Sequence, residues 1–328
     1  MKPTRLSKVL ESLIQTRWPA FIWGPPGIGK SAIVRDVARA HKLRVVDLRA
    51  SLLDPTDLRG IPSIQNGLAV WCPPSFLPKE GEPPGVLFLD EINAAPPMVQ
   101  ASLYQLVLDR RVGEYQLPDG WWIVAAGNRQ QDRAITFRMS SALANRFVHI
   151  ELETDITDWR TWAIAHQLDL NVISFLGVRP ALLWQEPGEE AAFASPRSWE
   201  ILSDVLKRFG SLKACQDLIP GIVGRGPAVE FATFVKRTIN ERQLEAIVAD
   251  PANAEIPSTL DGVYVLTSWL ALNAARDEVV RASAVLLNRI PVEFGVVLAS
   301  DMMKASPTFV RHPSYKEFVR THGQLIAR

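Results

Sequence analysis

The chain has 328 residues, 47% of them hydrophobic and 22% charged, which is the composition of a globular protein with room for at least two domains. Its formal net charge of +1 provides no overall field that would attract nucleic acid or an acidic membrane. The two cysteines lie far apart without further ligands, and the amino terminus has no long apolar stretch, so we expect a cytoplasmic protein without disulfides or zinc.

Short apolar runs alternate with helical patterns in the first half of the chain, which is typical of a parallel sheet flanked by helices. Helices are predicted to begin near Lys30, Pro97 and Ser140. Strands are predicted at residues 20–23, 44–48, 86–89, 122–126 and 147–152. The predicted fold class is therefore α/β, with a five-stranded parallel sheet sandwiched by helices.

The second half of the chain has a different hydrophobic pattern. After about residue 154 the β-branched runs give way to long amphipathic stretches, which predict a mostly helical structure. A polar stretch with prolines at 249–258 looks like a joint, and further helices are predicted to begin near Asp261, Asp277 and Pro291. We therefore expect an αβα core at 1–154, a helical domain at 155–248 and a helical extension at 249–328.

The turn after the first strand carries a phosphate-binding pattern. Residues 24–31 read Gly-Pro-Pro-Gly-Ile-Gly-Lys-Ser and fit G-x-x-x-x-G-K-[ST] between a strand and a helix. Such a loop points its backbone N–H groups at phosphates, with Lys30 on the β- and γ-phosphates and Ser31 on Mg²⁺. A chance glycine turn is the plainer alternative. The residues predicted to bind the nucleotide are Gly24, Pro25, Pro26, Gly27, Ile28, Gly29, Lys30, Ser31 and Ala32.

Two acidic residues end a second apolar run. Residues 86–91 read Val-Leu-Phe-Leu-Asp-Glu, as expected of a buried strand whose carboxyl end emerges beside the phosphate loop. Asp90 is predicted to hold Mg²⁺, and Glu91 to act as the base that activates the attacking water. The alternative is an acidic strand end at the surface.

Several motifs resemble those of a known family. Residues 90–93 read Asp-Glu-Ile-Asn, with Ala-Pro-Pro at 95–97 and Gln-Ala-Ser-Leu at 100–103, and this stretch resembles the MoxR branch of the AAA+ ATPases. The motif Asp-Pro-Thr-Asp-Leu-Arg-Gly at 54–60 is also similar to that family, and the likeness extends over roughly residues 6–240. The resemblance implies a P-loop AAA+ core, an all-helical lid, ATP and Mg²⁺ as cofactors, and a homo-hexameric ring.

The same resemblance implies roles for three polar residues. Asn128 corresponds to the first sensor, although the sequence Ala-Gly-Asn-Arg at 126–129 departs from the T-x-N-P that is common in the family. Arg146 corresponds to an arginine finger that completes the site of the next subunit, and Arg197 to a second sensor. A turn residue and two solvated helix-end arginines are the plainer alternatives. Arg138 is the best candidate for a second arginine acting in trans.

Two hairpins are predicted to contact whatever the ring acts upon. One lies within residues 60–85 and uses the run 67–71, and in the resembled family this region projects toward the central pore. The other runs from 111–117 through a turn at 118–120 to Trp121 and beyond. The aromatic side chains of Trp71, Tyr115 and Trp121 either contact a substrate or pack within the protein.

The leading function is a ring-forming ATPase that remodels, activates or assembles a partner protein. In the resembled family such partners often carry a von Willebrand factor A domain. A motor acting on nucleic acid is the first alternative. Residues 60–71 contain no lysine or arginine, which argues against it. A monomeric P-loop kinase or nucleotide switch, which needs no arginine finger, is the second.

Overall fold

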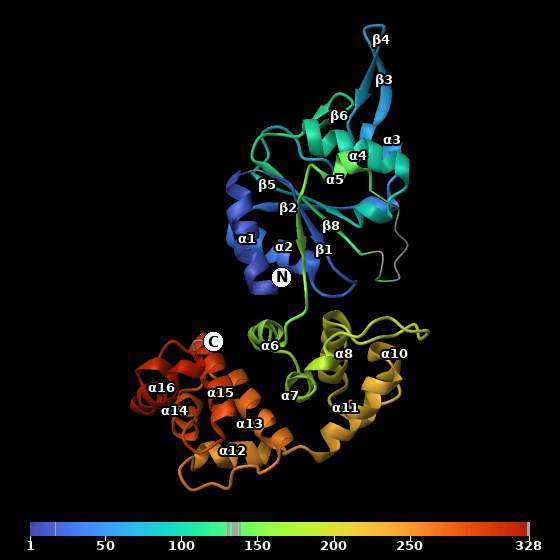
Figure 1. The fold of residues 1–328 in the computed structure, drawn as a ribbon. Coiled ribbons are helices and arrows are strands. Elements are labelled where there is room, and N and C mark those ends of the chain that lie inside the picture. The colour runs from blue at the N-terminus through green and yellow to red at the C-terminus, as the bar shows by residue number, and fades with distance from the viewer. Residues whose placement is uncertain (17, 130–131, 133–136, 138, 327–328) are drawn as a thin grey trace. The chain divides into compact units, whose positions relative to one another are not determined.

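We determined the fold from a computed structural model, which describes residues 1–16, 18–129, 132, 137 and 139–326. The chain divides into two compact units, Met1–Thr154 and Asp155–Arg328. Each unit contains its own cluster of buried hydrophobic side chains. Figure 1 shows the mixed first unit in blue to green and the helical second unit in green to red.

A five-stranded parallel sheet forms the centre of the first unit. The strand order is β2-β5-β8-β1-β9, so β1 lies between two strands that are distant from it in the sequence. The predicted α/β fold class is confirmed, and the five predicted strands are present with nearly the predicted bounds. These strands are β1 (Ala20–Trp23), β2 (Arg44–Arg49), β5 (Gly85–Asp90), β8 (Trp121–Gly127) and β9 (Val148–Glu151).

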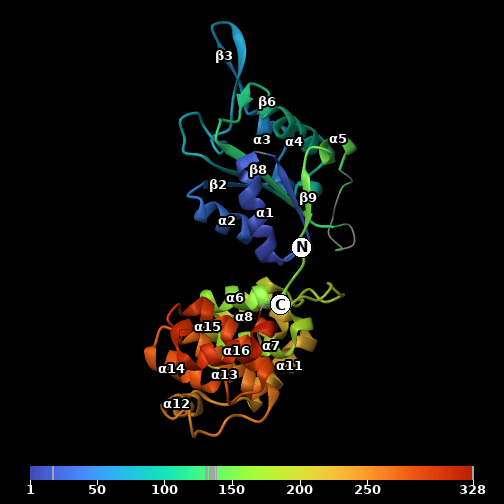
Figure 2. The same cartoon turned by 60° about the vertical axis from the view of Figure 1, so that its left-hand side comes forward.

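Helices cover both faces of this sheet (Figures 1 and 2). Because alternate side chains of a strand point to opposite faces, Phe21, Leu87 and Ile123 join a core cluster with α4, while Ile22 and Val124 are buried on the other face. The short 3-10 turns are η1 (Ala50–Leu52) and η2 (Ile92–Ala94). The helices are α1 (Pro3–Thr16), α2 (Lys30–Ala40), α3 (Pro55–Arg59), α4 (Pro97–Asp109) and α5 (Ser141–Ala144).

A hairpin of β3 (Ile61–Gln65) and β4 (Leu68–Cys72) projects from the first unit (Figures 1 and 2). Its tight turn uses Asn66 and Gly67, both with positive φ, as hairpin turns that match the strand twist require. The predicted arm at 67–71 is therefore confirmed.

The second predicted hairpin is wrong in one arm. Strands β6 (Arg111–Val112) and β7 (Tyr115–Gln116) pair with each other around Gly113, whose φ is +57°. Trp121, the predicted start of the second arm, instead begins β8 and pairs with Gly85 in the parallel sheet. The turn closes earlier than predicted because Gly113 supplies the positive φ that a short turn needs.

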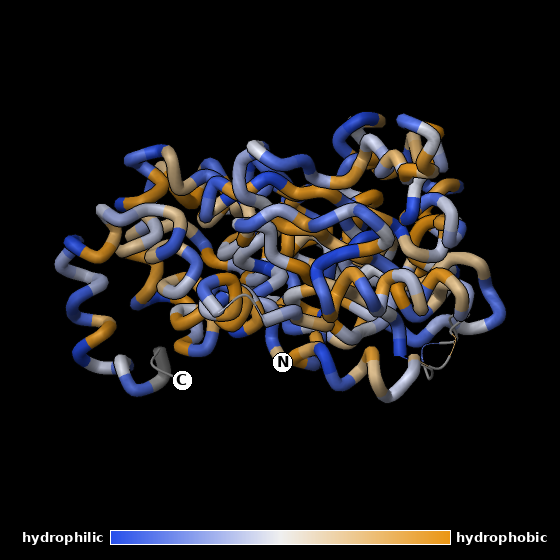
Figure 3. Tube along the Cα trace, turned by 90° about the horizontal axis from the view of Figure 1, so that it is seen from above, coloured by the Kyte–Doolittle hydropathy of each residue, from blue (hydrophilic) through white to orange (hydrophobic). Residues whose placement is uncertain are grey.

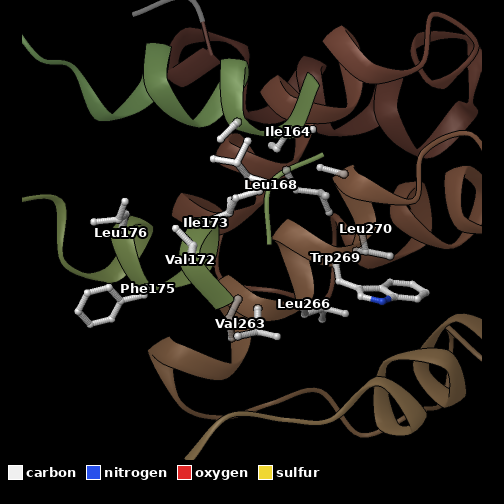
Figure 4. Close-up of a cluster of buried hydrophobic side chains, with 14 of the residues drawn as sticks. Ile164, Leu168, Val172, Ile173, Phe175, Leu176, Val263, Leu266, Trp269 and Leu270 are labelled. Atoms are coloured by element: carbon white, nitrogen blue, oxygen red, sulfur yellow. The ribbon is translucent and has the colours of Figure 1, made fainter. Parts of the chain in front are cut away.

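The second unit consists of helices, as predicted. Helices α7 and α13 pack against each other in its core, where Val172, Phe175 and Leu266 lie among the buried side chains of Figure 4. The helices and turns are α6 (Ile156–Ala165), α7 (Leu170–Val178), η4 (Pro180–Leu182), α8 (Pro196–Phe209), α9 (Leu212–Cys215), α10 (Pro220–Val223), α11 (Arg225–Arg237), α12 (Glu241–Ala249), α13 (Leu260–Leu272), α14 (Asp277–Leu286), α15 (Val292–Ala305), η5 (Phe309–Arg311) and α16 (Pro313–Ile326).

One core cluster contains residues from both sides of position 248, for example Phe175 and Leu266. The separation of a lid at 155–248 from an extension at 249–328 therefore stays a prediction. Helices α13, α14 and α15 begin close to their predicted starts, whereas α16 was not predicted. Its sequence has few apolar residues, although Phe318 is buried.

Hydrophilic residues interrupt the hydrophobic stretches throughout the chain (Figure 3). Within the part of the chain that the structure describes, no helix combines the length and the hydropathy needed to cross a membrane.

Candidate functional site

The phosphate loop lies between β1 and α2. Gly29 precedes the first residue of α2 with φ 97° and ψ 15°, and Gly27 has φ 79°. Both values belong to the left-handed region, which glycine adopts without steric cost, so the loop can curl toward the amino end of the helix. Of the residues predicted to bind the nucleotide, Gly24, Pro25 and Ile28 are buried, and Ala32 is exposed.

Lys30 turns back across this loop. Its ammonium group donates to the carbonyl oxygens of Gly24 (2.5 Å) and Pro25 (3.0 Å) and to Oδ1 of Asn128 (2.8 Å). The adjacent Ser31 is partly buried, and its hydroxyl makes no hydrogen bond to any residue that the structure describes. The loop therefore holds one ammonium and one hydroxyl at the first turn of α2.

The two acidic residues lie at the carboxyl end of β5. Asp90 is the last residue of the strand, and its Oδ1 accepts a hydrogen bond from the backbone N–H of Glu91 (3.0 Å). Burial raises the pKa of the Asp90 carboxyl, and the charge of Lys30 partly offsets this rise. Glu91 has φ 56°, an uncommon conformation for a residue other than glycine, and this conformation turns the chain out of the strand.

Ser51 holds the Glu91 carboxylate and was not identified from the sequence. Its hydroxyl donates to Oε2 of Glu91 at 2.6 Å. Ser51 belongs to η1, which follows β2, and β2 is the neighbour of β5 in the sheet. Serine is too common in turns for its identity to have predicted this contact, which depends on the strand order.

Asn128 follows β8 directly and lies next to the phosphate loop, since Trp23 of β1 pairs with Gly127. Its side chain accepts from Lys30, and its carbonyl accepts from Nδ2 of Asn93 (2.7 Å). Asn93 is 3% exposed, and its carbonyl accepts from the backbone N–H of Phe137 (2.7 Å). Asn93, quoted above only as part of a motif, therefore connects the turn after Glu91 to the segment that carries Asn128.

Close packing surrounds Asn93. A Cβ atom added at Gly127 would lie 2.4 Å from its Oδ1, so a larger residue than glycine would displace the side chain. That buried Oδ1 has no hydrogen-bond partner among the described residues. The loop that follows Asn128 includes residues 130–131, which lie outside the described residues.

Arg146 lies in the turn between α5 and β9 and is exposed. Strand β9 is parallel to β1, with Val148 paired to Ala20. Arg146 is therefore at the amino end of the sheet, whereas the phosphate loop begins at Gly24. From Ala20, which is level with Val148, the chain advances four residues to Gly24, or about 13 Å at roughly 3.3 Å per residue. No described residue forms a hydrogen bond or ion pair with the Arg146 side chain.

Arg197 lies in the second unit, at the second residue of α8, and is exposed. Ser195 caps this helix, since its hydroxyl accepts from the N–H of Ser198 at 3.1 Å and the Ser198 hydroxyl accepts from the N–H of Ser195. Capping fixes where α8 starts and hence the position of Arg197 within its own unit. Its proposed role as a second sensor stays a prediction.

Five arginines lie on both sides of Asn128 in the sequence, at positions 110, 111, 129, 133 and 138, and some of them make local contacts. Arg110 donates to the carbonyls of Pro118 and Trp121, and Arg129 pairs with the buried Asp132 (Nη2 to Oδ1, 2.9 Å). Arg111 is exposed. Arg133 and Arg138, the latter predicted to act in trans, lie outside the described residues.

Two aromatic residues predicted as possible substrate contacts instead pack inside the first unit. Trp121 is 1% exposed, and Tyr115 is 8% exposed with its hydroxyl donating to the carbonyl of Pro78 (2.8 Å). Burial raises the pKa of this phenol. Trp71, on the projecting hairpin, is partly exposed.

The donor groups at this site fit a magnesium nucleotide. Mg²⁺ prefers oxygen ligands and usually takes one or two protein groups beside phosphates and water, which matches the Ser31 hydroxyl and the Asp90 carboxylate. Among the described residues no cluster of three or more histidine, cysteine or acidic side chains could hold a metal by itself. The Ser31 hydroxyl and the Asp90 carboxylate would match a site completed by phosphate oxygens and water.

Comparison with known proteins agrees with this geometry. Residues 19–147 match the AAA domain of the dynein-related subfamily. The chain is 33% identical over 138 residues to the protein MoxR of Paracoccus denitrificans, which covers 40% of each protein, so the match spans less than half the length of that relative.

Two solved structures are also similar. NtrX from Brucella abortus is 18% identical with a TM-score of 0.42, over 77% of this chain and 62% of NtrX. A RuvB variant from Thermotoga maritima is 16% identical with a TM-score of 0.35, over 98% of this chain and 87% of RuvB. The first unit therefore contains a domain that matches the AAA domain family over residues 19–147, and 138 residues of the chain are similar to MoxR.

Proposed function

We propose that this protein is a ring-forming ATPase that couples ATP hydrolysis to the remodelling, activation or assembly of a partner protein. One observation carries the proposal. Lys30, Asp90, Glu91 and Asn128 meet at the carboxyl ends of the neighbouring strands β1, β5 and β8, where parallel sheets bind their ligands.

Each of these residues has a distinct part in hydrolysis. When bound, Mg²⁺ would neutralise phosphate charge, and Ser31 and Asp90 would hold it. Glu91 accepts the proton of the attacking water, and the Ser51 hydroxyl orients the Glu91 carboxylate. Lys30 places its ammonium where phosphate oxygens arrive, and Asn128 fixes the position of that ammonium from the other side.

The position of Arg146 supports a site that is shared between subunits. Arg146 lies at the opposite end of the sheet from its own phosphate loop, about 13 Å along the strand direction, which exceeds the reach of one side chain. Its guanidinium is exposed and has no partner among the described residues. We therefore propose that Arg146 serves the nucleotide of an adjacent copy, which implies a ring, and that a hexamer is the form this ring takes.

The projecting hairpin favours a protein partner. Residues 61–72 contain no charged side chain, and Ile61, Ile64 and Leu68 are 76%, 83% and 70% exposed. An uncharged apolar hairpin can bind apolar polypeptide, but it supplies none of the cations that bind a phosphate backbone. The resemblance to MoxR makes a partner with a von Willebrand factor A domain the first candidate.

We further propose that 155–248 acts as the lid, with Arg197 contacting the nucleotide.

The proposal can be tested by measuring particle size and ATPase rate across protein concentration, with and without ATP. We expect the rate per subunit to rise with assembly, because each site requires a neighbour. Arg146→Ala should lower the rate by roughly a thousandfold, the scale of an arginine finger, without weakening ATP binding. Arg111→Ala removes another exposed arginine of the same unit and serves as the control.

The alternatives predict other results. A monomer that hydrolyses ATP at full rate, or an Arg146→Ala protein with the rate of the control, would exclude the shared site and favour a kinase or switch. Strong stimulation by DNA that declines with salt would favour a motor on nucleic acid.

A further inference from the structure

We propose that His149 is a positioning residue that ties the turn carrying Arg146 to the strand leading into the phosphate loop of the same subunit. The inference rests on the proposed function, because it assumes that Arg146 acts in a neighbouring copy. It is carried by two hydrogen bonds that the imidazole makes to opposite sides.

The first bond fixes the tautomer of the ring. Nδ1 of His149 lies 2.8 Å from Nε1 of Trp23, and an indole N–H can only donate. Nδ1 is therefore the acceptor and Nε2 carries the hydrogen in the neutral ring. Nε2 lies 2.8 Å from the carbonyl oxygen of Ala144 and donates to it.

The second bond fastens the turn in which Arg146 lies. Ala144 is the last residue of α5, and its carbonyl also accepts from the backbone N–H of Phe147 (3.2 Å). The N–H of Arg146 donates to the carbonyl of Leu143 (3.1 Å). The turn is thus closed by its backbone bonds, and His149 attaches it to the side chains of the sheet.

Trp23 extends the connection to the phosphate loop. It directly precedes Gly24, whose carbonyl accepts from Lys30, and its own carbonyl accepts from the N–H of Leu152 (2.8 Å). Its long side chain reaches from the carboxyl end of β1 back toward the amino end of β9. The indole and His149 therefore bridge the two ends of the sheet.

Aromatic packing stiffens this bridge. The ring of Trp23 stacks on that of Phe21, with centroids 4.2 Å apart, and on that of His149 at 5.9 Å. Phe147 meets Phe21 edge-on at 5.3 Å. Because residues two apart on a strand share one face, all four rings lie on the same face of β1 and β9. A shift of the phosphate loop would thus be transmitted to the turn of Arg146.

Mixed rings separate this role from ordinary packing. The donor subunit carries Glu91→Gln and keeps Arg146, while the acceptor carries Arg146→Ala and keeps Glu91. Under the proposed function, only acceptor sites next to a donor finger hydrolyse ATP. The ATPase rate of the mixture should therefore exceed the summed rates of the two parent proteins, and this excess is the gain from mixing. If both parents assemble but mixing gives no gain, the shared site itself is refuted, whatever His149 does.

We then place His149→Ala in one subunit type at a time. In the donor it should lower the gain from mixing on the order of threefold to tenfold, the range for one lost hydrogen bond. In the acceptor the loss should be clearly smaller, because the acceptor contributes no finger and loses only the contact of His149 with Trp23. An equal loss from both placements, or no loss from the donor placement, would overturn the inference.

Trp23→Phe provides a second variant that keeps an aromatic ring and removes only the indole N–H. Placed in the donor, whose own site is already inactive, Trp23→Phe should lower the gain from mixing, as His149→Ala does. A donor gain that is unaffected by Trp23→Phe would show that Trp23 does not transmit the position of the phosphate loop. Thermal unfolding of each variant verifies that the fold is intact.

Discussion

Removing the carboxylate of Asp301 should strongly destabilise the second unit. Nε of Arg160 donates to Oδ2 of Asp301 at 2.7 Å, and Nη1 donates to the hydroxyl of Ser268 at 2.9 Å. Both charged side chains are 6% exposed, and Nη2 of Arg160 has no hydrogen-bond partner among the described residues. Asp301→Ala would leave a buried guanidinium without a counter-charge.

The expected cost is about 3–5 kcal/mol, the range for breaking a buried ion pair by removing one partner. For a unit of this size, that corresponds to a fall in Tm on the order of 6–20 °C. Far-ultraviolet circular dichroism follows the transition, because the second unit is almost entirely helical.

Two controls make the result interpretable. The pair of Arg179 and Glu230 is about half exposed at 3.6 Å, so Arg179→Ala should cost less than about 1 kcal/mol. The double variant Arg160→Met with Asp301→Leu removes both charges and should recover most of the loss. A loss in Asp301→Ala no larger than in Arg179→Ala, or a double variant as unstable as the single one, would refute the reasoning.

Four further outcomes are expected. Glu91→Gln should lower kcat roughly 100-fold or more, the scale of a general base, while a fluorescent ATP analogue still binds in titration. Asn93→Ala frees the carbonyl of Asn128 and should lower kcat about twofold to tenfold with ATP affinity retained, as steady-state kinetics would show. Reduced α-lactalbumin, an unfolded protein, should stimulate the ATPase rate by binding the exposed hairpin, and Ile64→Glu should abolish this stimulation and leave the basal rate unchanged. Burial raises the pKa of Asp169, so the native state binds more protons than the unfolded state, and the free energy of unfolding falls as pH rises from the ordinary to the raised pKa. Asp169→Asn keeps the helix cap, and its free energy of unfolding, measured by urea titration, should depend less on pH in that window.

Much of the first unit could be predicted from sequence because its signals are local. A buried parallel strand is a short apolar run, and a phosphate loop needs glycines at fixed offsets from a lysine. These signals located β1, β5 and β8 and the residues at their carboxyl ends. The strand order then brings Lys30 and Asn128 within hydrogen-bond distance.

The contacts that support the site could not be predicted in the same way. Ser51 and Asn93 act through partners that are 40 and 35 positions away, and ordinary residue types give no local signal of such a contact. Trp121 was assigned to a hairpin because a turn precedes it, yet its pairing with Gly85 in the sheet decided its place. Tertiary pairing overrode the local turn signal there.

The uncharged hairpin of β3 and β4 has a consequence for how the protein behaves in solution. Natural sheets usually discourage edge-to-edge aggregation with lysine, proline or bulges along their outer strands, and this tip offers only Pro62. The two strands pair only with each other in the described part of the chain, and the N–H of Trp71 donates to the carboxylate of Glu114. The other outer backbone groups of the hairpin can pair with foreign strands. The hairpin therefore favours aggregation through strand pairing. The protein should stay monodisperse when it is dilute or bound to its partner and aggregate when it is concentrated and free.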